Sequence, residues 1–173
     1  MLTPMHPIHL VVMGVSGCGK STLAGALAHA LGLPLIEGDD FHPPANRAKM
    51  AEGTPLTDAD REGWLAALGE QLQAAPAGAV MSCSALKRVY RARLRAACPG
   101  LRFAFLQLSR EAAVQRVAAR AAEHFFPDHL VASQFATLEP PLGEPGVLAL
   151  DATRPLAELV DEVARWVPTG AAA

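Results

Sequence analysis

The most informative stretch of this 173-residue chain is Gly14-Val15-Ser16-Gly17-Cys18-Gly19-Lys20-Ser21. It fits the pattern G-x-x-x-x-G-K-[ST], in which glycines let the backbone fold around a phosphate with its N–H groups pointing inward. The pattern carries this meaning only between a strand and a helix. An apolar run precedes it at 8–13, and helix-forming residues follow it at 20–31 until Gly32. We therefore expect a strand, a phosphate-binding loop and a helix, rather than a chance glycine-rich turn.

The expected phosphate-binding loop predicts a nucleotide site. Lys20 is placed to reach the β- and γ-phosphates, and the Ser21 hydroxyl is placed to bind Mg²⁺. Cys18 is either a reactive thiol at a helix N-terminus or, as we favour, a small filler residue. The chain lacks the N-K-x-D motif of guanine recognition, which argues against a GTPase switch. The expected ATP-binding residues are Gly14, Ser16, Gly17, Cys18, Gly19, Lys20, Ser21 and Thr22.

Apolar runs alternate with helical patterns along the rest of the chain. We expect strands at 8–13, 35–37, 79–83, 102–108 and 147–150, and helices at 20–31, from Asp58 onward, and at 86–97, 111–120, 130–138 and 155–167. This order predicts an α/β fold with a five-stranded parallel sheet flanked by helices. We expect one domain with its core at about 8–167 and a frayed tail at 168–173. Ligands in such folds lie at the carboxyl ends of the strands.

Composition excludes several classes of protein. Apolar residues make up 51% of the chain, and 15 basic against 17 acidic residues give a net charge of −2, which argues against a nucleic-acid partner. No run of about 18 apolar residues is present to span a membrane. The three cysteines form neither a disulfide framework nor a zinc spacing, so a reducing cytoplasm is the expected location.

Polar residues after the second expected strand indicate an acceptor site. In Gly38-Asp39-Asp40-Phe41-His42-Pro43, Asp39 is a candidate to accept the proton of a substrate hydroxyl or to help hold Mg²⁺. A turn with a local aspartate cap is an equally weighted alternative. Further on, Arg61 is a candidate for a bidentate pair with an anion, whereas Asp58 fits a helix N-cap and Trp64 fits the core.

Two pairs of cations follow later strands. Lys87 and Arg91 are four residues apart, so on the expected helix at 86–97 they share a face that can hold an anionic substrate. Arg116 and Arg120 have the same spacing before His124-Phe125-Phe126-Pro127, which fits a lid that closes on the transferring phosphate. For both pairs, a solvated basic helix face is the alternative.

The motif series as a whole resembles the gluconokinase family of P-loop carbohydrate kinases. The resemblance covers about residues 8–167 and is carried by GVSGCGKST (14–22), EGDDFHPPANRAKMAEGTPLTDADREGWL (37–65), CSALKRVYRARLR (83–95), HFFPDHLVASQFATLEPP (124–141) and LDATRPL (150–156). It departs from the family at Gly63, where a proline is usual, and in the three residues between Arg120 and His124, where two are usual.

The resemblance implies phosphorylation of D-gluconate at O6 by ATP and Mg²⁺, a nucleoside-monophosphate-kinase-like fold with a lid, and a homodimer. It places the substrate contact and base on Asp39 and the family's Asp-Arg pair on Asp60 and Arg61. It places two further substrate cations on Lys87 and Arg91. It places the lid arginine on Arg116 or Arg120 and the lid histidine on His124. His42 completes the expected substrate contacts. Two alternatives are a kinase of another hydroxy acid such as shikimate and a nucleotide-binding regulatory module.

Overall fold

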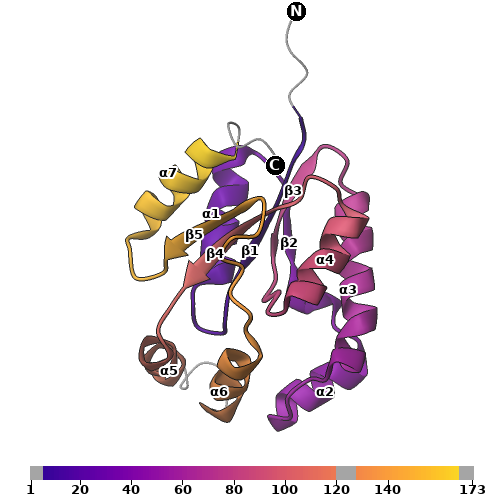
Figure 1. Ribbon diagram of the computed structural model, residues 1–173, viewed down its shortest axis with the longest axis vertical. Coiled ribbons are helices and arrows are strands. Elements are labelled where there is room, and N and C mark those ends of the chain that lie inside the picture. Colours follow the sequence, from indigo (N-terminus) through magenta and orange to yellow (C-terminus); the bar gives the residue numbers. More distant parts are fainter. Residues whose placement is uncertain (1–5, 120–127, 168–173) are drawn as a thin grey trace, which may run out of the picture.

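Five parallel strands form one sheet, as the sequence predicts. The computed structural model describes residues 6–119 and 128–167 (Figure 1). The strands run in the order β2-β3-β1-β4-β5. Their bounds are β1 (Ile8–Met13), β2 (Leu35–Glu37), β3 (Gly78–Ser82), β4 (Arg102–Gln107) and β5 (Val147–Asp151).

Helices cover both faces of this sheet. α1 (Lys20–Leu31) and α7 (Leu156–Trp166) lie on one side, and α3 (Asp58–Gln73) and α4 (Arg88–Ala97) lie on the other (Figure 1). Leu10 and Val12 of β1 belong to the core under α1 and α7, whereas Val11 and Met13 belong to the core under α3 and α4. This alternation explains why β1 is apolar throughout, because side chains on both of its faces are buried.

The remaining helices lie near the carboxyl ends of the strands. They are α2 (Pro44–Glu52), α5 (Arg110–Ala119) and α6 (Asp128–Thr137), all at the bottom of Figure 1. α2 was not among the predicted helices because it has no apolar stripe: four of its nine residues are polar or charged, and three of the others are alanines. A 3-10 turn, η1 (Gly38–Phe41), occupies the segment expected to be a plain turn.

The start of α3 at Asp58 agrees with the prediction, but its cap and the start of α4 differ from it in ways that affect the site. The N-cap of α3 is Thr57 rather than Asp58: Thr57 Oγ1 accepts from the N–H of Asp60, whose carboxylate accepts from the N–H of Thr57. This reciprocal capping box fixes the start of the helix. α4 begins at Arg88 rather than at residue 86, and Lys87 is its extended N-cap. The other elements agree with the predicted ranges to within one or two residues.

Several predictions lie outside the described residues. They concern Arg120, His124 with the expected lid at 124–127, and the expected frayed tail at 168–173. Within 6–119 and 128–167, no helix has the length and apolar character required to cross a membrane.

Candidate active site

The phosphate-binding loop connects β1 to α1, as predicted. Gly14 has φ 149° and Gly19 has φ 95°, conformations that favour glycine. A Cβ atom at Gly14 would lie 2.7 Å from Cys18 Sγ and 2.9 Å from the Leu106 carbonyl oxygen. Cys18 is only 2% exposed, and burial raises the pKa of its thiol. The side chain therefore packs beneath the loop as a filler, and the loop backbone has no room for a larger first residue.

Two cations accompany this loop. Lys20 Nζ donates to the Val15 carbonyl oxygen at 3.4 Å. Arg116 of α5 donates from Nη1 to the carbonyl oxygens of Gly17 and Cys18 at 3.3 and 3.2 Å, and from Nη2 to Ala152 at 3.0 Å. Arg116 thus joins the loop to the segment after β5. Both cations lie where charge on a bound phosphate would be neutralised.

A carboxylate that sequence reasoning missed contacts the loop. Glu37, the last residue of β2, accepts from Ser21 Oγ at 3.0 Å and from Ser82 Oγ at 2.6 Å, in both cases through Oε2. Ser82 is buried at the end of the neighbouring strand β3. The only signal in the sequence was the position of an acidic residue at the end of a strand. The Ser21 hydroxyl, expected to bind Mg²⁺, is therefore hydrogen-bonded to a carboxylate oxygen, which is itself a ligand type that Mg²⁺ prefers.

Asp39 lies directly after Glu37 and Gly38, in η1. Its side chain is 72% exposed, and its Oδ1 lies 3.7 Å from Nε2 of the buried His42. The nearby His42 ring lowers the pKa of the Asp39 carboxyl, and the positive charge of Lys20 lowers it further. Asp39 is therefore an ionised, accessible carboxylate that feels the charge of the loop lysine.

The backbone under Asp39 is held by Trp64. Its Nε1 donates to the Gly38 carbonyl oxygen at 2.8 Å, and its ring stacks on that of His42 with centroids 4.2 Å apart. Trp64 is 1% exposed, as predicted for a core residue. His42 also lies within 3.3 Å of Asn46 Nδ2 through Nδ1. The orientation of Asp39 is consequently set by a rigid aromatic layer.

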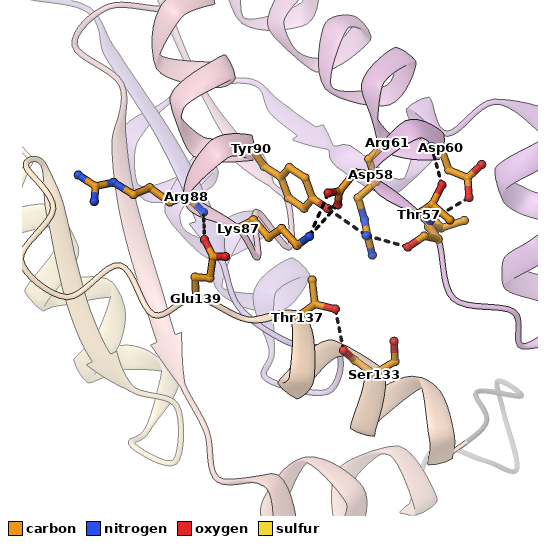
Figure 2. Close-up of polar contacts among 11 residues, drawn as sticks. Thr57, Asp58, Asp60, Arg61, Lys87, Arg88, Tyr90, Ser133, Thr137 and Glu139 are labelled. Carbon is orange, nitrogen blue, oxygen red and sulfur yellow. Dashed lines mark hydrogen bonds and ion pairs between the residues drawn. The ribbon is translucent and has the colours of Figure 1, made fainter.

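A second polar cluster lies between the starts of α3 and α4 (Figure 2). Lys87 Nζ donates to Asp58 Oδ1 and Oδ2 at 2.9 and 3.1 Å, and the Tyr90 hydroxyl donates to Asp58 Oδ1. Arg61 Nη1 donates to the Leu56 carbonyl oxygen at 2.9 Å and to the Tyr90 hydroxyl at 3.1 Å. The structure thus unites the predicted cations Arg61 and Lys87. It adds Tyr90 and Asp58, which sequence reasoning did not assign to the site.

The hydrogen bonds in this cluster favour the charged forms of Asp58 and Lys87 and the neutral form of Tyr90. Hydrogen bonds from Tyr90 and Lys87 lower the pKa of Asp58. Burial and the bond to Asp58 raise the pKa of Tyr90, while the bond to Asp58 raises that of Lys87. The site therefore contains a carboxylate, a neutral phenol and two cations at neutral pH.

Arg91 does not share a helix face with Lys87, contrary to prediction, because Lys87 precedes the helix. Arg91 is 0% exposed and donates to both carboxylate oxygens of Glu144, at 3.1 and 2.6 Å. It also donates to the carbonyl oxygens of Ala85, Leu86 and Glu139 at 2.8–3.1 Å. These contacts make Arg91 a support for the segment that precedes α4.

Cys83, directly after β3, is influenced both by the loop region with Lys20 and Asp39 and by Arg61 of the polar cluster. The Cys83 thiol, 1% exposed there, has its pKa raised to about 12, first by burial and then by the charge of Asp39. The positive charges of Lys20 and Arg61 oppose this rise. One buried atom thus lies within the field of the loop lysine, the candidate base and the candidate anion-binding cation.

A phosphate-binding loop at the carboxyl edge of a parallel sheet, facing an ionised carboxylate, defines a P-loop kinase. An AAA domain family model (AAA_33) matches residues 10–141. The chain is 44% identical to a gluconokinase of Gluconobacter oxydans over 93% of this chain and 92% of that protein. It is 39% identical to the thermoresistant gluconokinase of Escherichia coli, over 98% and 99% of the two chains.

A solved structure agrees with these relatives. The crystal structure of a gluconokinase from Sinorhizobium meliloti matches with a TM-score of 0.86 and 50% identity, covering 94% of each chain. The chain belongs to the gluconokinase family, as its motif series indicated.

Proposed function

We propose that this chain transfers the terminal phosphoryl group of ATP to O6 of D-gluconate, giving 6-phospho-D-gluconate and ADP. The observation that carries the proposal is the ionised Asp39 carboxylate within the field of Lys20, together with the cations Arg61 and Lys87 in the polar cluster between the starts of α3 and α4. A hydroxy acid requires both kinds of partner, an acceptor for its hydroxyl and cations for its carboxylate. The gluconokinase relatives support this choice of acid.

The nucleotide half of the site acts by position and charge. The loop N–H groups from Gly14 to Thr22 would hold the phosphates, and Lys20 would neutralise the oxygens of the terminal group. Arg116 would add a second positive charge at the loop and keep it fixed against the segment after β5. Phosphoryl transfer needs little more from a protein than such positioning and neutralisation.

The acceptor half would orient one hydroxyl. Asp39 would accept a hydrogen bond from O6–H and take its proton as the new O–P bond forms. Because His42 and Lys20 lower its pKa, this carboxylate orients the hydroxyl at rest, and it accepts the proton only once the forming O6–P bond makes O6–H strongly acidic. Arg61 and Lys87 would hold the carboxylate of gluconate. His42 and His124 are proposed as further substrate contacts.

The residues present fit a magnesium ion. Mg²⁺ prefers oxygen ligands and keeps several waters. Ser21 offers its hydroxyl, and Glu37 offers a carboxylate 3.0 Å from that hydroxyl. Asp39, in the turn directly after β2, offers a second carboxylate. Bound there, the ion would neutralise charge on the phosphates, while Glu37 would keep the Ser21 hydroxyl proton turned away from it.

The test is a coupled assay of ADP release with Mg-ATP. D-gluconate, shikimate, glucose, glycerate and water would be compared for wild type, Asp39→Asn and the neighbouring Asp40→Asn as a matched control. We expect turnover with gluconate only, reduced about 10²–10⁴-fold in Asp39→Asn and little changed in Asp40→Asn. Turnover with another acid would contradict the proposed substrate, and nucleotide binding without any acceptor turnover would contradict the kinase proposal.

The proposal extends to a homodimer in the cytoplasm. The buried free thiols of Cys18, Cys83 and Cys98 support a reducing compartment, since none is disulfide-bonded in the part of the chain that the structure describes. Analytical ultracentrifugation tests the dimer, because a single species of 18.2 kDa would contradict it.

A further inference from the structure

Gln134 of α6 contacts the phosphate-binding loop from a distant part of the chain. Its Oε1 accepts a hydrogen bond from the Ser16 N–H at 2.6 Å, across 118 residues of sequence. Ser16 is the third residue of the loop, so this N–H is one of the donors available for a phosphate. One of the loop donors is thus bound to a side-chain amide.

A bound phosphate would change this contact. Phosphate oxygens only accept hydrogen bonds, whereas a glutamine amide has an accepting oxygen and an NH₂ group with two donors. When a phosphate oxygen takes the Ser16 N–H, the Gln134 oxygen loses its partner. Rotation of the terminal amide would then direct its NH₂ group to the same phosphate. Gln134 can therefore interact with the loop in both states, as acceptor without nucleotide and as donor with it.

The other end of α6 identifies the phosphate concerned. Glu139, just beyond α6, donates its N–H to the Leu86 carbonyl oxygen at 2.8 Å and accepts from the Arg88 N–H at 2.9 Å (Figure 2). These contacts fix the C-terminal end of α6 to the segment that contains Lys87, on the acceptor side. α6 with the residues just after it thus extends from the phosphate-binding loop, at Gln134, to the segment on the acceptor side, at Glu139. The phosphate facing that side is the one that is transferred.

We propose that Gln134 donates a hydrogen bond to the terminal phosphate of ATP, exchanging its contact with the Ser16 N–H for one with the transferred group. The inference rests on the proposed function for the presence of ATP in the loop. It adds to the site a residue on α6, an element to which the family resemblance and the sequence assigned no phosphate contact. It also makes α6 and the residues just after it a link between the phosphate-binding loop, through Gln134, and the segment that contains Lys87, through Glu139.

Binding measurements separate ATP from ADP. Calorimetry with Mg²⁺ would compare ADP and the non-hydrolysable β,γ-imido analogue of ATP on wild type, Gln134→Ala and Gln134→Glu. We expect Gln134→Ala to weaken the analogue about tenfold or more, because a hydrogen bond to a charged group is lost, and to change ADP less than about twofold. Gln134→Glu should weaken the analogue further, since a carboxylate accepts from Ser16 but repels phosphate.

The control is Gln73→Ala. Gln73 donates to the Ala97 carbonyl oxygen at the C-terminal end of α3, away from the loop, and its removal should alter neither affinity. Tighter analogue binding by Gln134→Ala would overturn the proposal, because Gln134 would then only compete for Ser16. Equal losses for ADP and the analogue would overturn it as well, since they indicate a purely structural role. Wild type that binds both nucleotides but does not phosphorylate gluconate would refute the proposed function alone, because the binding comparison would still decide the role of Gln134.

Discussion

Replacing Arg91 by alanine tests whether this arginine supports the fold or contacts the substrate. The sequence places it among the substrate cations, whereas the structure places its guanidinium inside the protein with five hydrogen bonds. Two of these bonds reach Glu144, whose side chain is 8% exposed. Burial raises the pKa of the Glu144 carboxyl, and the bonds from Arg91 and Arg95 outweigh that effect and lower it overall. The carboxylate therefore stays ionised in the interior and needs its cation.

The expected loss of stability follows from these contacts. Removing one partner of a buried ion pair costs about 3–5 kcal/mol, because the other charge is left unpaired. Arg95 Nη1 still donates to Glu144 at 2.9 Å, so the lower end of that range applies. At about 2–4 °C per kcal/mol for a chain of this size, Arg91→Ala should lower the melting temperature by about 6–12 °C.

The assay is thermal unfolding followed by circular dichroism, with Arg95→Ala as the matched control. Arg95 is 24% exposed and makes one of the three bonds to Glu144, so its loss should cost about 1 kcal/mol or less. Arg91→Lys should restore little, because an ammonium cannot reproduce the fork of a guanidinium. A melting temperature of Arg91→Ala within about 2 °C of wild type, with a raised KM for gluconate, would refute the structural role.

Three further predictions concern stability and thiol chemistry. Gly38→Ala should lower the free energy of unfolding in urea by about 1–3 kcal/mol or more, because its Cβ would lie 2.2 Å from a carbonyl oxygen of β3. Gly63→Ala, with nothing within 4 Å, should raise it by about 1 kcal/mol; equal effects of the two changes would contradict this reasoning. Cys83, buried with a pKa of about 12, should react with a disulfide reagent at pH 8 only after unfolding, and rapid reaction of the folded protein would show that the site opens. Lys49 lowers the pKa of Asp60 from 3.8 to about 2, so stability present above pH 4 should fall as the pH drops toward 2, and Asp60→Asn should flatten this part of the urea-measured profile.

The sheet and the loop could be predicted because their signals are local. An apolar run such as 8–13, a glycine-rich turn and a helix ended by Gly32 each depend on neighbouring residues only. The same reasoning missed α2, a short helix that follows Pro43 and has no apolar stripe. It also placed the start of α4 two residues early, at 86: Lys87 is extended and contacts Asp58, 29 residues away, which spacing along the chain does not indicate.

The partners within the site could not be predicted, for the same physical reason. Glu37 reaches Ser82 across 45 residues, and Gln134 reaches Ser16 across 118. Neither residue type nor spacing along the chain indicates these contacts, which arise only when the sheet order brings the strand ends together. The family resemblance supplied the substrate and the acceptor-side residues, but it grouped Arg91 with Lys87. The burial of Arg91 predicts that the two residues have separate roles, which the Arg91→Ala variant tests.

The structure also ranks the two cations proposed for the gluconate carboxylate. Lys87 is bound by both oxygens of the Asp58 carboxylate, so an incoming carboxylate must displace or share a matched negative charge. Arg61 donates instead to a carbonyl oxygen and a phenol, which are neutral acceptors and weaker competitors for a guanidinium. Substrate binding therefore costs less at Arg61, and we infer that Arg61 is the principal anchor of the acid. Lys87 and Asp58 then form a neutral pair that lines the site and leaves the guanidinium to select a negatively charged substrate.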